Sequence, residues 1–262
     1  MSAPPAPETF LSGQTGHVAG IRRRTLRRAA DIALDARLLT MRRRLDRLAA
    51  EAPRRSVVAA CLHRPGAAPP PLASECHDLR LLAASTAELT GGKYENLRTL
   101  LGNAPQADWT LVVDDDVDLP ARFLDRFLGV CEHLGLALAQ PAQTLASHAA
   151  WPVTRRRAGV LARETRFVEI GPVTAFRRSV AEALMPFPAL RYGWGLDLHW
   201  SALAAQRGWC AGVVDAVPVR HERSPVAATY PAAEAIEEAQ RFLAGKPHLT
   251  AAEAAETVAV HR

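Results

Sequence analysis

The feature that most limits the fold is a short apolar run that ends in a cluster of acids. Residues 109–113 (WTLVV) are followed by Asp114, Asp115, Asp116 and Asp118, four carboxylates within five positions. Neighbouring carboxylates repel one another, so they must either fan out into water or face a cation. An apolar strand with acids at its C-terminal end is typical of an α/β sheet, in which ligands bind beyond the carboxyl ends of the strands.

Other segments of the chain alternate between strand-like and helix-like patterns. Short apolar runs at 56–62 and 212–219 predict strands, 93–101 predicts a helix with Tyr94, Leu97 and Leu101 on one face, and 171–179 predicts a strand running into a helix. Residues 77–84 fit either a strand or a helical turn. We therefore expect an α/β domain with a mainly parallel central sheet flanked by helices.

Length and composition limit the organisation of the chain. At 262 residues it can bury a core as one domain with extensions. Its apolar stretches are far shorter than the ~20 residues of a membrane span, and residues 1–20 lack the features of a secretory signal. We expect a cytoplasmic protein with a disordered segment at 1–20, a basic helical extension at 21–52, the main domain at 53–230 and C-terminal helices at 231–262. The C-terminal helices are expected to be two short ones, at 231–244 and 250–258.

The positive charge is concentrated in the segment Arg22 to Arg55. This segment holds twelve Arg against four acids, a balance of +8 within a net charge of +5, which leaves −3 for the rest. Apolar residues recur there at helical spacing: Leu26, Ala30, Leu34, Leu38, Met41, Leu45 and Leu48. We expect one long helix ending near Pro53, whose stripe packs on the main domain or on a second subunit. Attachment to the inner face of an anionic membrane is the alternative. We expect no nucleic-acid partner, because the segment has no aromatic residue for stacking.

A metal ion is the natural partner for the acids after the third strand. Hard divalent cations prefer oxygen ligands, and the carboxyl end of a central strand is where a ligand site is expected. The alternative is a helix-capping loop that begins after Asp118 and Pro120. His221, just beyond the strand at 212–219, is a candidate third ligand, although a lone histidine is more often structural.

These pieces together resemble the GT-A glycosyltransferase fold. They are most similar to a bacterial and plant family, the domain of unknown function 707. The segments that carry the likeness lie between about residues 90 and 225: DWTLVVDDDVDLP, QPAQTLASHAAWPVTRRR, RETRFVEIGPV, YGWGLD and VVDAVPVRHERSP. The order of a DxD strand, a strand-to-helix turn at RRS, a GWGxD segment and a final histidine is that of galactosyltransferase-like members of the fold.

The resemblance implies a metal-dependent glycosyltransferase of the hexosyltransferase type. Such an enzyme moves a sugar from a nucleoside diphosphate sugar to an acceptor hydroxyl, here with inversion. Mn²⁺ or Mg²⁺, held by Asp114 and Asp116 with His221, would neutralise the diphosphate leaving group. Asp197 would take the proton from the acceptor hydroxyl as general base. Its alternative role is a cap for the helix that follows.

Further positions take roles from the same resemblance. Asp115 is expected to reach the ribose or the sugar, and Lys93 and Asn96 lie where relatives touch the nucleotide. Trp194 is expected either to stack on a donor or acceptor sugar or to belong to the core. Glu169 and Arg166, in the segment RETRFVEIG, lie where similar proteins shape the acceptor side, and the two could instead form a structural pair.

The sequence departs from the family's pattern at two places, and two alternative functions stay open. Asp197 stands alone where many relatives have a Glu-Asp pair, and the proline-rich loop HRPGAAPPPLAS follows the first strand. One alternative is a GT-A-like module that binds a nucleotide or glycan without turning it over. The other is a haloacid-dehalogenase-like phosphatase, although its DxDx motif normally opens the domain and continues with Thr or Val, where this chain has Asp118.

Overall fold

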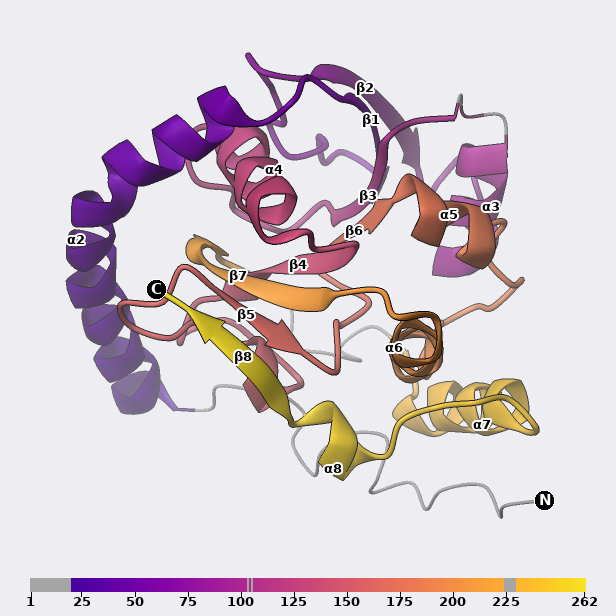
Figure 1. The fold of residues 1–262 in the computed structure, drawn as a ribbon. Coiled ribbons are helices and arrows are strands. Elements are labelled where there is room, and N and C mark those ends of the chain that lie inside the picture. Colours follow the sequence, from indigo (N-terminus) through magenta and orange to yellow (C-terminus); the bar gives the residue numbers. More distant parts are fainter. Residues whose placement is uncertain (1–19, 103, 105, 224–229) are drawn as a thin grey trace.

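The computed structural model describes residues 20–102, 104, 106–223 and 230–262. These residues form an α/β domain in which helices flank one sheet and a long helix precedes it (Figure 1). The α/β class and the N-terminal helix are as the sequence predicts. The expected disordered segment at 1–20 lies outside the described residues, except for Gly20.

The sheet is mixed. Its strands are β1 (Ser56–His63), β2 (Asp78–Ser85), β3 (Trp109–Asp114), β4 (Leu138–Gln143), β5 (Ala162–Thr165), β6 (Val173–Arg177), β7 (Ala211–Val219) and β8 (Thr257–His261), in the order β2-β1-β3-β6-β4-β7-β5-β8. Strand β1 is parallel to β2 and β3, and β4 is parallel to β7. Strands β5, β6 and β8 run antiparallel to their neighbours. The segment that fitted a strand or a helical turn is the edge strand β2.

Alternate side chains of the strands feed two cores on opposite faces of the sheet. On β3, Trp109, Leu111 and Val113 belong to one core, whereas Val112 belongs to the other. Helix α4 (Phe123–Leu134) contributes to the first core, and α3 (Lys93–Gly102), α5 (Arg178–Leu184) and α6 (Leu196–Arg207) contribute to the second. Because side chains along a strand alternate between faces, one apolar run fills both cores. The carboxyl ends of β1 and β3 remain available for a site.

Helix α2 (Ile21–Glu51) runs along the outer side of the domain (Figure 1). Its C-terminal half packs against α4 through Leu45, Leu48 and Ala49, all buried. The helices approach closely at Gly129, where a Cβ atom would lie 2.8 Å from Cα of Ala49. The predicted apolar stripe does not reach the domain along its whole length, because Leu26 is 72% exposed. None of the described helices is long and apolar enough to cross a membrane.

The C-terminal segment differs from the prediction of two helices. Helix α7 (Ala232–Leu243) agrees with it, but the second helix is the single turn α8 (Ala251–Ala254), and Thr257–His261 form β8. The prediction of a helix over 250–258 is therefore wrong beyond Ala254. Alanine and glutamate favour a helix locally, whereas the sequence TVAVH, which contains β-branched residues, pairs with the free edge of β5.

Candidate functional site

The four acids at and just after the end of β3 each pair with a different basic side chain. The partners are Lys93 for Asp114 (2.6 Å), Arg64 for Asp115 (3.0 Å), His221 for Asp116 (3.1 Å) and Arg223 for Asp118 (3.4 Å). Asp116 is buried, whereas the side chain of Asp118 is 61% exposed. The repulsion within the cluster is therefore relieved by pairing with basic side chains and, for Asp118, by exposure to water.

Two loops far apart in the sequence bring Asp116 and His221 together. The backbone of Asp118 pairs with that of Arg220 through two hydrogen bonds, N to O, of 2.8 and 3.1 Å. The backbone N–H of His221 also donates to Oγ of Ser147 at 2.9 Å. The positions of both side chains are thus fixed by main-chain contacts next to them.

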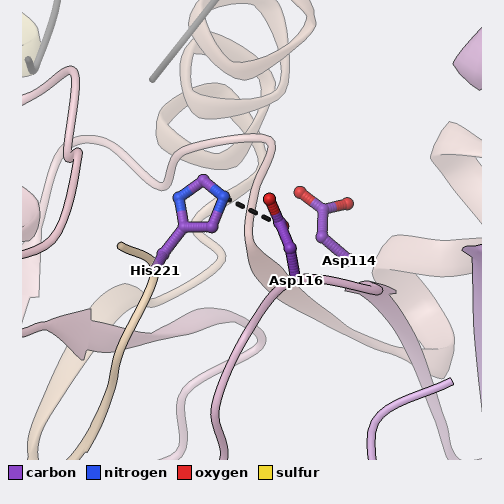
Figure 2. A group of neighbouring side chains, drawn as sticks. All are labelled: Asp114, Asp116 and His221. Atoms are coloured by element: carbon purple, nitrogen blue, oxygen red, sulfur yellow. Dashed lines mark ion pairs between the residues drawn. The ribbon is translucent and has the colours of Figure 1, made fainter. Parts of the chain in front are cut away.

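Asp114, Asp116 and His221 form a group with metal-ligand chemistry (Figure 2). One carboxylate oxygen from each aspartate and one ring nitrogen of the histidine lie within 4.8 Å of one another. Two carboxylates and an imidazole are donors that suit a divalent ion such as Mn²⁺ or Mg²⁺. These three donors therefore fit the ion that the sequence led us to expect, and their role as its ligands stays a prediction.

The charges of this group support one another. Burial alone would raise the pKa of Asp116, but the hydrogen bond and charge of His221 outweigh it and lower that pKa. Burial likewise opposes protonation of His221, and Asp116 reverses the effect, so that the pKa of His221 is raised. Lys93 follows the same rule beside Asp114, whose charge raises the pKa of the ammonium despite burial. In each pair, the two partners stabilise each other's charged form despite burial.

A cavity of about 380 Å³ lies against this group. The residues predicted to be catalytic, to bind the metal or to bind the nucleotide sugar all line it: Lys93, Asn96, Asp114, Asp115, Asp116, Trp194, Asp197 and His221. Leu62 and Arg64 contribute from the end of β1, so the cavity opens at the carboxyl ends of β1 and β3. A pocket of this size holds a small organic ligand.

Asp197 reaches the cavity from the first turn of α6. The turn before it needs glycine: φ is +78° at Gly193 and +86° at Gly195, and a Cβ at Gly193 would lie 2.1 Å from the ring of Tyr94. Gly195 is the N-cap of α6, and no side chain caps the helix. Asp197 instead accepts a hydrogen bond from the backbone N–H of Leu198 at 2.9 Å. Burial raises the pKa of Asp197 to about 7, so its carboxyl group changes charge near neutrality.

Glu169 is a second buried carboxyl group in the same cavity. Burial, followed by the charge of Asp197, raises the pKa of Glu169 to about 8. Nε2 of Gln143 donates to Oε2 of Glu169 at 2.8 Å, and Oε1 of Gln143 is buried without a hydrogen-bond partner among the described residues. Arg166 pairs with Glu256 at 2.6 Å, so it forms no pair with Glu169. Sequence reasoning did not single out Gln143, because its pairing with Glu169 joins distant segments.

Asn96 and Trp194 line the cavity but also hold its walls together. The amide of Asn96 donates to the carbonyl oxygens of Leu89 and Gly91 at 2.8 and 2.9 Å, which fixes the turn before α3. Nε1 of Trp194 donates to the hydroxyl of Tyr230 at 3.0 Å. Trp194 is buried, so it belongs to the core and to the cavity wall at once.

Comparison with known proteins gives a distant structural likeness. No protein-family model matches the sequence, so membership of the domain of unknown function 707 family stays a prediction. No curated protein matches it either. The structure is similar to the mannosyltransferase PcManGT from Pyrobaculum calidifontis in complex with GDP-Man and Mn²⁺, with 16% identity and a TM-score of 0.47. The likeness covers 76% of this chain and 68% of that one. At that distance it carries no information on the donor, acceptor or metal of this chain.

Proposed function

We propose that the protein is a metal-dependent glycosyltransferase of the GT-A type. It would transfer a hexosyl group from a nucleoside diphosphate sugar to an acceptor hydroxyl. The observation that carries the proposal is one cavity that holds both a ligand set of Asp114, Asp116 and His221 and a buried carboxyl group, Asp197, with a pKa of about 7.

In this proposal the ligand set and its neighbours receive the diphosphate. A divalent ion bound there would supply Lewis-acid stabilisation of the negative charge on the leaving group. Lys93, beside Asp114, adds a cationic side chain to the same wall of the cavity. Asp115 is assigned to the ribose or the sugar, and the indole of Trp194 to a sugar face.

Asp197 is assigned the proton transfer. As the acceptor oxygen forms its bond to the anomeric carbon, the bond from that carbon to the diphosphate breaks and the hydroxyl proton passes to the Asp197 carboxylate. One displacement inverts the anomeric configuration. A pKa of about 7 suits a base that works at neutral pH, because the group is then both ionised in part and basic enough to take the proton.

The first test is ligand-dependent thermal stability. Nucleoside diphosphates and nucleotide sugars are screened with and without Mn²⁺ on the wild type, on Asp116→Asn and on the matched control Asp118→Asn, whose carboxylate is exposed. A ligand at 100 times its dissociation constant adds about 2.7 kcal/mol to the free energy of unfolding. We expect one nucleotide to stabilise the wild type and the control only when metal is present, and to have no effect on Asp116→Asn. If no nucleotide stabilises the protein with any divalent metal, the proposal fails.

A further inference from the structure

The outward face of α2 carries an uncovered apolar surface. Ile21, Leu26, Ile32 and Leu39 are 87%, 72%, 67% and 67% exposed, and they are four of the seven large hydrophobic side chains exposed in the described part of the chain. At steps of three and four residues the exposed stripe continues through small side chains: Leu26, Ala29, Ile32, Ala36 and Leu39. The apolar surface therefore extends over about four turns of one helix.

Arginines lie at both ends of this stripe and beside it. The guanidinium groups of five exposed arginines of α2 have no hydrogen bond or ion pair with any described residue: Arg22, Arg23, Arg37, Arg43 and Arg47. Three of the four acids of α2 contact the domain instead, and the fourth, Glu51, is the exposed last residue of the helix. Asp31 and Asp35 contact Arg156 at 3.3 and 2.7 Å, and Asp46 contacts Arg122 at 2.9 Å. The outward face of α2 is consequently cationic and apolar at once.

We infer that this face of α2 binds an anionic membrane surface in the plane of the lipid headgroups. The leucine and isoleucine side chains would enter the boundary between headgroups and acyl chains, and the arginines would meet lipid phosphates and anionic headgroups. A second copy of the chain fits less well. If the outward faces of two α2 helices packed together, their arginines would lie against one another with few acids to pair them. A nucleic acid would leave the apolar side chains uncovered.

The inward face of α2 performs a separate task. Asp31 accepts hydrogen bonds from the backbone N–H groups of Leu145 and Ala146, both at 2.9 Å, and so holds the loop that carries Ser147. Ser147 in turn fixes the backbone of His221. Since the two faces have different contacts, substitutions on the outward face leave the contacts of the site in place. The inference is therefore independent of the proposed function.

The test is sedimentation with lipid vesicles. Binding of the full chain to phosphatidylcholine vesicles with and without phosphatidylglycerol is compared for the wild type and two α2 variants, Leu26→Ser/Ile32→Ser/Leu39→Ser and Arg22→Gln/Arg43→Gln. Matched controls remove the same side-chain types elsewhere: Val258→Ser, which is 63% exposed on β8, and Arg80→Gln/Arg98→Gln, which are exposed and unpaired among the described residues. Unchanged circular dichroism and melting temperature show that the variants are folded.

We expect the wild type and the controls to bind only the anionic vesicles, and more weakly at high salt. The arginine variant should lose about 25-fold in binding, at roughly fivefold for each cation near the surface. The serine variant should lose at least about tenfold. The inference is overturned if anionic vesicles do not bind the wild type, or if both α2 variants bind like the controls. It is also overturned if the wild type is a dimer in analytical ultracentrifugation that the serine variant converts to a monomer.

Discussion

Nε2 of His221 lies 3.1 Å from Oδ1 of Asp116, a contact between the segments that follow β7 and β3. A carboxylate oxygen and an imidazole nitrogen are both of the kinds that coordinate metal ions, and the main-chain pairing of Asp118 with Arg220 holds them in place.

This contact predicts that His221 is a metal ligand. We expect His221→Gln to weaken Mn²⁺ binding by at least about tenfold, because one of three protein donors is lost. Isothermal titration calorimetry measures it. The matched control is His261→Gln, a histidine that also pairs with a carboxylate, Glu164 at 2.9 Å, but lies outside the cavity. Equal Mn²⁺ affinity in wild type and His221→Gln would remove His221 from the ligand set.

Asp197 is predicted to carry the proton transfer. Asp197→Asn should lower kcat for sugar transfer by about 10²–10⁴-fold, the usual contribution of a general base. Nucleotide and metal affinity should stay within about twofold of the wild type, because Asn preserves the size of the side chain and the ligand set is untouched. Asp118→Asn serves as the control for the loss of one carboxylate.

The same assay separates the alternatives. A wild-type protein that binds nucleotide and metal but transfers no sugar to any acceptor would favour a non-catalytic binding module. Release of phosphate from an aryl phosphate, lost in Asp114→Asn, would favour a phosphatase with Asp114 as nucleophile. Residual transfer equal to wild type in Asp197→Asn would leave Asp197 a structural role only.

The pH dependence of transfer should report the ionisation of Asp197. Since burial raises its pKa to about 7, the fraction of carboxylate increases through that pH, and kcat should rise from about pH 6 to pH 8. Glu169→Gln should keep this acidic limb, because Glu169 titrates higher, at about 8. A wild-type rate that is flat between pH 5 and pH 8 would contradict the assignment.

The buried carboxyl group of Asp197 should also destabilise the fold at neutral and higher pH. Its pKa rises from 3.8 to about 7 on folding, so its contribution to stability is present below about pH 4 and is lost as the pH rises through 7. That difference corresponds to at most about 4 kcal/mol. Asp197→Asn should therefore have a larger free energy of unfolding than the wild type at pH 8. In urea denaturation, this difference should become smaller as the pH is lowered toward 5. A difference in the free energy of unfolding that does not change with pH would show that ionisation of Asp197 does not destabilise the fold.

The sequence was sufficient to predict that Asp114, Asp116, Asp197 and His221 lie near one another, because each lies at the end of a clear local pattern. Asp114 and Asp116 follow an apolar run, His221 follows another, and Asp197 follows a Gly-Trp-Gly turn. In an α/β sheet such ends converge at one edge, so the topology alone places them near one another.

Other features depend on contacts between distant segments, which no local pattern contains. The pairing of Gln143 with Glu169 joins the end of β4 to the loop before β6. Strand β8 forms because β5 has a free edge, although the preceding alanines and glutamates favour a helix. The apolar stripe that the sequence predicts from Leu26 to Leu48 has helical spacing along its whole length. Only tertiary structure decides that Leu45 and Leu48 are buried while Leu26 is exposed.

A buried ion pair between β5 and β7 should make a large contribution to stability. The side chains of Arg163 and Asp215 are fully buried and 2.7 Å apart, and Arg163 also donates to the carbonyl oxygens of Val153 and Arg155. Arg163→Met leaves Asp215 charged or protonated without its main partner, so we expect a loss of about 3–5 kcal/mol in the free energy of unfolding. Arg241→Gln, in an exposed pair with Glu237, should cost less than about 0.5 kcal/mol in the same urea titration. The double variant Arg163→Met/Asp215→Leu should recover much of the loss in stability, because no charge is then left buried and unpaired. Equal losses in the single and double variants would show that Arg163 stabilises the fold by packing and not through the ion pair.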